Sequence, residues 1–241
     1  MAIRVAQQLL GRIFFQRCFY LFILLLAFDL VVPFVDPGPH GKFLINSLSC
    51  LIVVSAVAAV GRTVLSFVIV SLLATAALLF LWLSAEHEDA THLATACGFG
   101  AALDLATIVY LLVYVFRPEV MTADKLFGAA AAYLLIGSFW AKLYALTNHF
   151  YPGSFVGLGN APSSDLIDYL YFSYTVLTST GFGDVVPKSR QARAICNVEQ
   201  LTGALYVAIL IARLAGVYPP MPKGEQKNRD VKNLPPGTGE C

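Results

Sequence analysis

The sequence predicts an all-α membrane protein with six transmembrane helices and a shorter helical segment between the fifth and the sixth. Of its 241 residues, 58% are hydrophobic and only 13% are charged, and the mean hydropathy is +0.71. A water-soluble domain of this length has too little interior for so many apolar side chains, which favours a lipid bilayer as the surrounding medium. The apolar residues are also gathered into long runs, and short polar or proline-containing links separate these runs.

The first four spans are predicted at residues 18–35, 43–60, 64–85 and 93–116. The first span follows a basic segment, residues 1–17, which we expect in the cytoplasm. A signal peptide also begins basic and continues apolar, but this run is long, contains Asp29 and lacks a small-residue cleavage site. The link between the second and third spans is so short that these two helices must run antiparallel.

The last two spans are predicted at residues 126–146 and 194–217, with a short helix at residues 165–177 between them. Ser164 and Asp165 are a suitable N-cap for the short helix, which contains neither glycine nor proline. Residues 218–241 are rich in lysine, proline and glycine, so we expect a disordered cytoplasmic tail.

The basic residues set the predicted orientation. If the N-terminus lies in the cytoplasm, most of them face inward: Arg4, Arg12, Arg17, Arg62, Arg117, Lys125, Arg213 and those of the tail. Fewer face outward: Lys42, Lys188, Arg190 and Arg193. This asymmetry agrees with the positive-inside rule and predicts a multi-pass protein of the plasma or inner membrane with both termini inside.

A glycine-containing segment directly after the short helix carries the predicted chemistry. It reads Thr178-Ser179-Thr180-Gly181-Phe182-Gly183-Asp184, and Pro187 follows. A dehydrated cation can be held by backbone carbonyls that point at one axis. Such a path needs backbone angles that alternate in hand, and glycine adopts the left-handed ones without a Cβ penalty. The carbonyl end of the preceding helix carries partial negative charge, which also favours a cation.

This segment resembles the signature of the potassium channel family, T-T-V-G-Y-G-D. The resemblance implies a re-entrant pore helix followed by a selectivity filter at Thr178, Ser179, Thr180, Gly181, Phe182 and Gly183. It also implies that K⁺ is held by the carbonyls of four of these residues, Ser179, Thr180, Gly181 and Phe182. Thr178 would close the pore helix, and Asp184 would anchor the outer end of the filter against Tyr171.

Two residues depart from the family pattern. Ser179 stands where the family usually has threonine, so the hydroxyl is kept and the methyl that restricts its rotamer is lost. Phe182 stands in place of tyrosine and lacks a hydroxyl that would tie the filter to its surroundings. Potassium selectivity is still expected, with a softer filter.

The resemblance divides the chain into a four-helix module, residues 18–117, and a pore domain, residues 118–217. It predicts a passive K⁺ channel that is a homotetramer, because one pore loop does not close a ring. The module takes the place of a voltage sensor, but the fourth span carries no arginine or lysine before Arg117, so little voltage dependence is expected. The alternatives are a weakly selective cation channel and a non-conducting accessory subunit.

Several single residues have more than one interpretation. Gly203 in the sixth span is either a gating hinge or a point of close helix approach. Lys142 and Glu199 form an intramembrane pair, or Glu199 braces the pore helix, or Lys142 extends to the interface while Glu199 bonds locally. Asp29 and Asp104 are protonated, bonded to hydroxyl groups or exposed to a polar crevice.

The sequence also disfavours other functions. Four cysteines, Cys18, Cys50, Cys97 and Cys196, lie in apolar spans and Cys241 is terminal, so neither disulfides nor a metal site is indicated. His87 and His92 are five residues apart, which does not fit the zinc motif H-E-x-x-H.

His149 is either a surface histidine or a pH sensor at the outer mouth. The net charge of +1 disfavours a nucleic-acid partner. We expect no enzymatic activity and no cofactor, and any ligand sensor would be a separate regulatory subunit.

Overall fold

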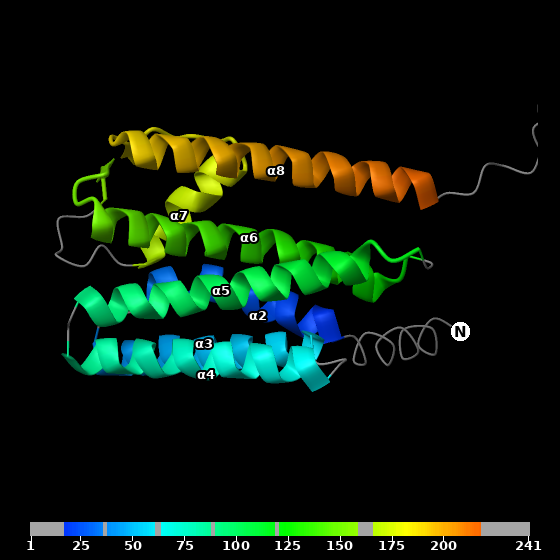
Figure 1. Cartoon of the computed structure of the whole chain (residues 1–241), viewed down its shortest axis with the longest axis horizontal. Coiled ribbons are helices and arrows are strands. Elements are labelled where there is room, and N and C mark those ends of the chain that lie inside the picture. The colour runs from blue at the N-terminus through cyan, green and yellow to red at the C-terminus, as the bar shows by residue number, and fades with distance from the viewer. Residues whose placement is uncertain are drawn as a thin grey trace, which may run out of the picture.

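The chain forms a bundle of long, roughly aligned helices with one short helix set across them (Figure 1). The computed structural model describes residues 17–35, 38–60, 64–87, 90–118, 121–158 and 166–217. Most of the N-terminal segment, the predicted tail at 218–241 and the proposed N-cap of Ser164 and Asp165 lie outside these residues.

The elements follow the predicted apolar runs closely. The first part of the chain forms α2 (Arg17–Val31), a short 3₁₀ helix η1 (Val32–Phe34), α3 (Pro39–Val60), α4 (Val64–His87) and α5 (Ala90–Val115). The second part forms α6 (Ala123–Phe150), β1 (Phe155–Val156), α7 (Leu166–Leu177), β2 (Val186–Pro187) and α8 (Arg190–Val217). The short helix α7 therefore occupies the predicted place between the last two long helices.

Four of the described helical segments are long and apolar enough to cross a membrane: Arg17–Phe34, Thr91–Val115, Ala123–Phe150 and Arg190–Gly216. Two further apolar stretches, Phe43–Ala59 and Val68–Phe80, are shorter. A mostly helical membrane architecture is supported to this extent, with one short strand pair beside the helices. The total of six spans and the re-entrant pore helix stay predictions.

Helix α6 is the centre of the bundle. It packs against α2 and α5 on the side of the first four long helices, and against α7 and α8 on the other side (Figure 1). Ala131 and Ala132 on α6 have no exposed surface. Small side chains let helices approach closely, and the resulting van der Waals contacts stabilise helix pairs where burial from water is not the driving force.

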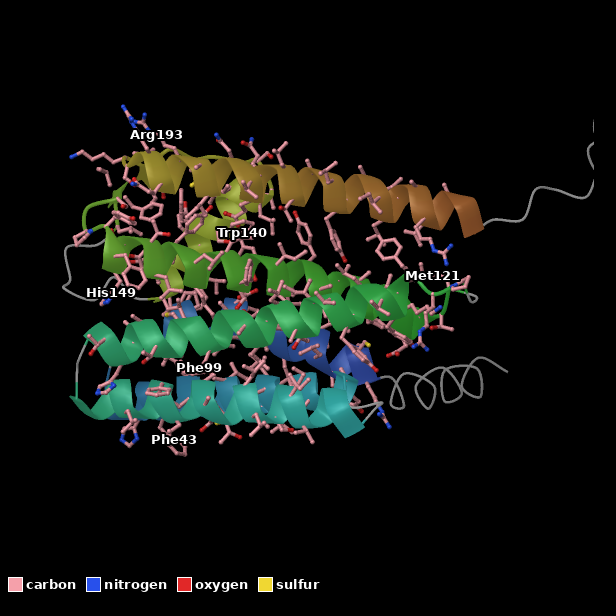
Figure 2. The ribbon with its side chains drawn as sticks, in the orientation of Figure 1. Phe43, Phe99, Met121, Trp140, His149 and Arg193 are labelled. Carbon is pink, nitrogen blue, oxygen red and sulfur yellow. The ribbon has the colours of Figure 1, made fainter. Side chains whose placement is uncertain are left out.

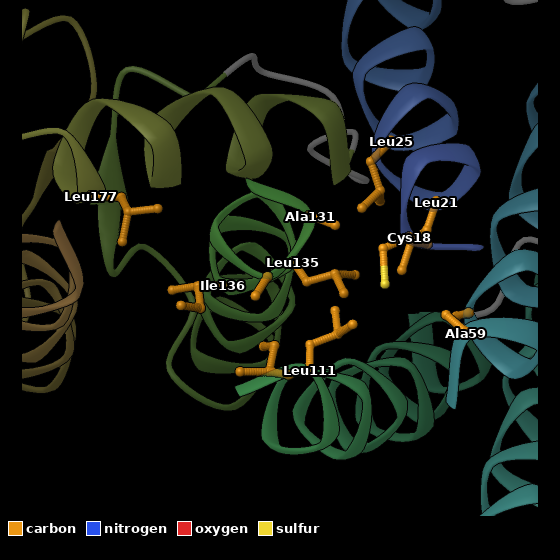
Figure 3. Packing of buried hydrophobic residues seen from close by; sticks show 12 residues of the cluster. Cys18, Leu21, Leu25, Ala59, Leu111, Ala131, Leu135, Ile136 and Leu177 are labelled. Carbon is orange, nitrogen blue, oxygen red and sulfur yellow. The ribbon is translucent and has the colours of Figure 1, made fainter. Parts of the chain in front are cut away.

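The apolar core joins these helices. Figure 3 shows Leu21 and Leu25 of α2 facing Leu135 of α6, with Leu111 of α5 closing the same cluster. Leu177, the last residue of α7, belongs to this cluster as well, so the end of the short helix is packed against the core.

Asp124 joins the beginning of α6 to two helices of the module. Thr122 caps α6 by accepting a hydrogen bond from the backbone N–H of Lys125 at 3.3 Å. Asp124, in the first turn of α6, accepts from the backbone N–H of Cys18 at 3.0 Å and from the hydroxyl of Tyr114 at 2.8 Å. The module and α6 are therefore bonded at this end of the bundle.

Candidate functional site

The segment 178–183, here called the filter segment, begins where α7 ends. Its first amide groups are bonded back to the carbonyl end of that helix: Ser179 N donates to Val176 O at 2.9 Å, and Thr180 N donates to Thr175 O at 2.9 Å. Gly181 N also donates to Thr175 O, at 3.2 Å. Because these N–H groups point toward α7, the carbonyl groups of the filter segment are not used by that helix and are available to a ligand.

The backbone of the filter segment alternates in hand. Ser179, Gly181 and Gly183 have φ angles of +57°, +55° and +82°, while Thr180 and Phe182 between them do not have positive φ. Alternation of this kind turns successive carbonyls toward the same side, as a carbonyl-lined ion path requires. The left-handed angles of the two glycines agree with the prediction from sequence.

Ser179 is the feature of this backbone that the sequence did not indicate. Among the described residues it is the only non-glycine with a positive φ. A left-handed conformation costs an L-residue roughly 1–2 kcal/mol. Strain of this size is kept where the surrounding contacts enforce it and is characteristic of functional segments.

The outer end of the filter segment rests on α7. The hydroxyl of Tyr171 donates to Asp184 Oδ2 at 2.7 Å, and the rings of Tyr171 and Phe182 stack with centroids 6.4 Å apart and planes within 5°. The Tyr171 hydrogen bond holds the pKa of the Asp184 carboxyl below its ordinary value. The structure therefore brings together Tyr171 and Asp184, the two residues proposed to support the filter.

A short antiparallel strand pair holds the chain that follows the filter segment. Phe155 and Val156 of β1 pair with Pro187 and Val186 of β2. Next to this pair, a Cβ on Gly157 would lie 1.8 Å from the carbonyl oxygen of Asp184. The loop after α6 thus packs directly against the exit of the filter segment, and no larger side chain fits at Gly157.

A buried polar cluster lies behind α7. Glu199 of α8 has no exposed surface and accepts from Ser173 Oγ of α7 at 2.5 Å and from the hydroxyl of Tyr144 of α6. Ser173 also bonds to the carbonyl of Gly137 at 2.8 Å. This cluster connects the three helices nearest the filter segment, in agreement with the interpretation that Glu199 braces the short helix.

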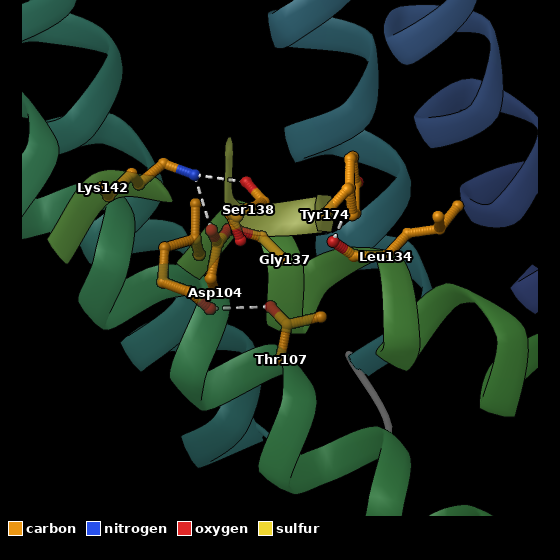
Figure 4. A network of polar contacts seen from close by, with 9 residues as sticks. Asp104, Thr107, Leu134, Gly137, Ser138, Lys142 and Tyr174 are labelled. Atoms are coloured by element: carbon orange, nitrogen blue, oxygen red, sulfur yellow. Dashed lines mark hydrogen bonds and ion pairs between the residues drawn. The ribbon is translucent and has the colours of Figure 1, made fainter. Parts of the chain in front are cut away.

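Lys142 has a different partner from the one expected. Its ammonium group lies 2.5 Å from Asp104 Oδ2 of α5 and 2.6 Å from Ser138 Oγ (Figure 4). The predicted pairing of Lys142 with Glu199 is therefore wrong, because the two side chains are engaged by different neighbours. The same contact gives Asp104 a lysine as its partner. The interpretations from sequence were protonation, a bond to hydroxyl groups or exposure to a polar crevice, and a lysine partner was not among them.

Asp29 of α2 accepts a hydrogen bond from the hydroxyl of Tyr174 of α7, at 2.9 Å. Bonding to a tyrosine hydroxyl was one of the alternatives for this residue. The contact joins the first helix of the module to the helix that precedes the filter segment, although the two residues are 145 positions apart.

Gly203 of α8 lies against the end of α7. A Cβ at this position would come within 2.1 Å of the Leu177 carbonyl oxygen. α8 continues without interruption through Gly203. This geometry supports the interpretation of close helix approach, and a hinge at Gly203 stays a prediction.

The histidines discussed from the sequence are only partly described by the structure. His149 lies near the end of α6, on the same end of the bundle as Arg193 and opposite Met121 (Figure 2). The side chain of His87 lies outside the described side chains, and so does the loop of Glu88 and Asp89. Within the described part of the chain, no group of three or more His, Cys, Asp or Glu residues is arranged to hold a metal ion.

Part of the chain is similar to a known protein family. Residues 126–218, less than half of the chain, match a family model described as an ion channel. This segment contains most of α6 and all of α7, the filter segment and α8. No curated protein and no solved structure matches the chain. This match and the apolar helices support a membrane protein whose residues 126–218 are similar to ion channel domains.

Proposed function

We propose that this protein is a K⁺-selective channel in which the filter segment coordinates dehydrated ions through backbone carbonyls. The observation that carries the proposal is the left-handed backbone at Ser179, Gly181 and Gly183, directly after the carbonyl end of α7. The amide groups of the segment are tied to α7, so its carbonyl oxygens remain free to replace the hydration shell of an ion. Passive conduction is the activity expected of the ion channel domain.

We further propose that four copies assemble around one axis. One chain supplies one strand of carbonyls, which cannot surround an ion. Two features support assembly through the filter segment and α8. All residues of the filter segment are exposed in the single chain. α8 also exposes large apolar side chains, namely Val198, Leu201, Leu205, Val207, Ile209 and Ile211. A closed ring of identical subunits would cover both.

The proposed tetramer has little voltage dependence. Helix α5 occupies the position of the charged helix of a voltage sensor, and Ala90–Val115 contains no arginine or lysine. Each elementary charge that crosses the membrane field contributes about 2.3 kcal/mol per 100 mV, so a module without such charges gains little energy from voltage. Its Asp104 is also held by Lys142 of α6, which opposes sliding of α5.

The purified protein in a planar bilayer tests the selectivity. With K⁺ on one side and Na⁺ on the other, we expect a reversal potential close to the equilibrium potential of K⁺. We also expect an open probability that changes little with voltage. A reversal potential near zero would instead make the protein a weakly selective cation channel, which the softer filter containing Ser179 and Phe182 makes the main alternative. Absence of current would favour the non-conducting accessory subunit.

A further inference from the structure

A hydrogen bond between Asp29 and Tyr174 links the module to the helix that precedes the filter segment. Asp29 lies on α2, the first helix of the module, and Tyr174 lies on α7, four residues before Thr178. The carboxyl oxygen and the hydroxyl oxygen are 2.9 Å apart. Neither a voltage sensor nor an ion path requires this contact, so its role is not explained by the proposed function.

Contacts with α6 fix the position of the Tyr174 side chain. Its ring lies in a notch at Gly137 of α6, where a Cβ would come within 2.3 Å of the ring. Its hydroxyl also lies 3.2 Å from the carbonyl oxygen of Leu134, a residue labelled beside Tyr174 in Figure 4. The ring therefore has little freedom to move sideways, and Asp29 fixes the position of its tip.

A continuous series of hydrogen bonds leads from Tyr174 to the filter segment. The carbonyl of Tyr174 accepts from the backbone N–H of Thr178 at 3.1 Å and from the Thr178 hydroxyl at 2.7 Å. The Thr178 hydroxyl lies 2.7 Å from the hydroxyl of Thr180. A shift of Tyr174 along α7 would therefore move the carbonyl that sets Thr178 and, through it, the side chain of Thr180.

We propose that Asp29 is a positioning residue for ion selectivity: through Tyr174 it fixes the inner half of the filter segment. The four-helix module, which lacks gating charges, would thus act as a fixed support of the filter. This inference rests on the proposed function, because selectivity is a property of a conducting channel. Asp29 lies outside residues 126–218, the segment similar to ion channel domains. The proposal therefore gives a residue outside that segment an effect on the ion path.

The test compares four single variants and the double variant Asp29→Ala with Tyr174→Phe, each in the whole chain, with the wild type. Tyr174→Phe removes the hydroxyl and keeps the ring in the Gly137 notch, and Asp29→Ala removes the acceptor. Asp29→Asn keeps an oxygen that can accept the bond. Tyr114→Phe is the matched control, because Tyr114 makes the same type of bond, 2.8 Å to Asp124, at the beginning of α6 and away from Tyr174.

The first measurement is the K⁺ to Na⁺ permeability ratio. We expect Tyr174→Phe and Asp29→Ala to lower it by similar factors, roughly two- to tenfold, as the loss of one hydrogen bond allows. The double variant should be no worse than either single variant. Asp29→Asn should restore most of the ratio, and Tyr114→Phe should leave it unchanged. Wild-type ratios in both Tyr174→Phe and Asp29→Ala, or additive effects, would overturn the proposal.

The second measurement does not depend on conduction. Amide hydrogen exchange at Ser179, Thr180 and Gly181 should become faster in Asp29→Ala and Tyr174→Phe, and stay unchanged in Tyr114→Phe. If exchange at these amides is unaltered by both substitutions, the positioning role is wrong whether or not the protein conducts. If exchange responds but the wild type passes no K⁺, the proposed channel function fails and the contact between the module and the filter segment stands.

Discussion

Lys142 on α6 and Asp104 on α5 form an ion pair between the two halves of the molecule, with 2.5 Å between the ammonium nitrogen and the carboxylate oxygen. Gly100 makes room for the lysine stem, since a Cβ there would lie 2.9 Å from the Lys142 Cε. Both side chains are largely buried, at 16% and 10% exposure. The pair therefore fixes the position of α5 against the ion channel domain.

We predict that Asp104→Asn destabilises the protein much more than removal of both charges. The single substitution leaves the Lys142 charge buried without its partner, which costs about 3–5 kcal/mol in comparable buried pairs. Replacement of both residues, Asp104→Asn with Lys142→Met, should recover most of that loss. Thermal unfolding of the detergent-solubilised protein measures the difference. Equal stability of the single and double variants would contradict a paired role.

Gly183 and Gly153 offer a comparison in which the backbone strain is matched. Their φ angles are +82° and +77°, and nothing lies within 4 Å of the position of a Cβ at either residue. Alanine at each position should thus cost a similar roughly 1–2 kcal/mol of left-handed strain. Only Gly183→Ala should abolish K⁺ flux, because only Gly183 belongs to the filter segment. A conducting Gly183→Ala variant would remove this segment from the ion path.

The bond between Tyr171 and Asp184 predicts a defined dependence of stability on pH. The pKa of Asp184 is lowered in the folded protein, mainly by the Tyr171 hydrogen bond. The contribution of this bond to the stability of the folded protein is therefore fully present at pH values above the ordinary pKa of 3.8. It is lost as the pH falls through the lower pKa that Asp184 has in the folded protein. We expect the melting temperature of the wild type to exceed that of Tyr171→Phe by a constant amount from about pH 7 to about pH 5. The gap should narrow as the pH falls below 3.8. A gap that widens on acidification would contradict this sign.

Gly203 can be tested against a glycine of the same helix. Alanine at Gly203 would collide with the Leu177 carbonyl at 2.1 Å, while alanine at Gly216 meets nothing within 4 Å. We expect Gly203→Ala to lower the stability of the protein and Gly216→Ala to leave it unchanged or raise it slightly, by at most about 1 kcal/mol. A stable Gly203→Ala variant with altered open probability would favour the hinge instead.

Hydropathy predicted the positions of the helices because a long apolar run has few alternatives in a membrane. The predicted short helix at 165–177 corresponds to α7 at Leu166–Leu177, since this run contains neither glycine nor proline and a glycine-containing segment follows it. The filter segment was proposed from its resemblance to the potassium channel signature, and its role in ion conduction stays a prediction. The left-handed angles at Gly181 and Gly183 follow from residue type, and their alternation with Thr180 and Phe182 agrees with that expectation.

The contacts between helices were not predictable in the same way. Asp104 meets Lys142 and Asp29 meets Tyr174 because of how each helix is rotated about its axis, and the apolar runs carry little information on rotation. Lys142 and Glu199 were matched by opposite charge and similar predicted depth, yet depth alone does not bring two side chains together. The positive φ of Ser179 was also not predictable, because serine does not favour this conformation by itself. The hydrogen bonds of the segment to α7 hold the backbone there.

Flux from liposomes tests the central claim most directly. Vesicles that contain K⁺ and are placed in Na⁺ medium receive the purified protein, and the potential across the membrane is followed by a voltage-sensitive dye. Our account predicts rapid K⁺ efflux that creates an inside-negative potential, and its loss in Gly183→Ala but not in Gly153→Ala. Vesicles that keep their K⁺ gradient with wild-type protein present would contradict the account.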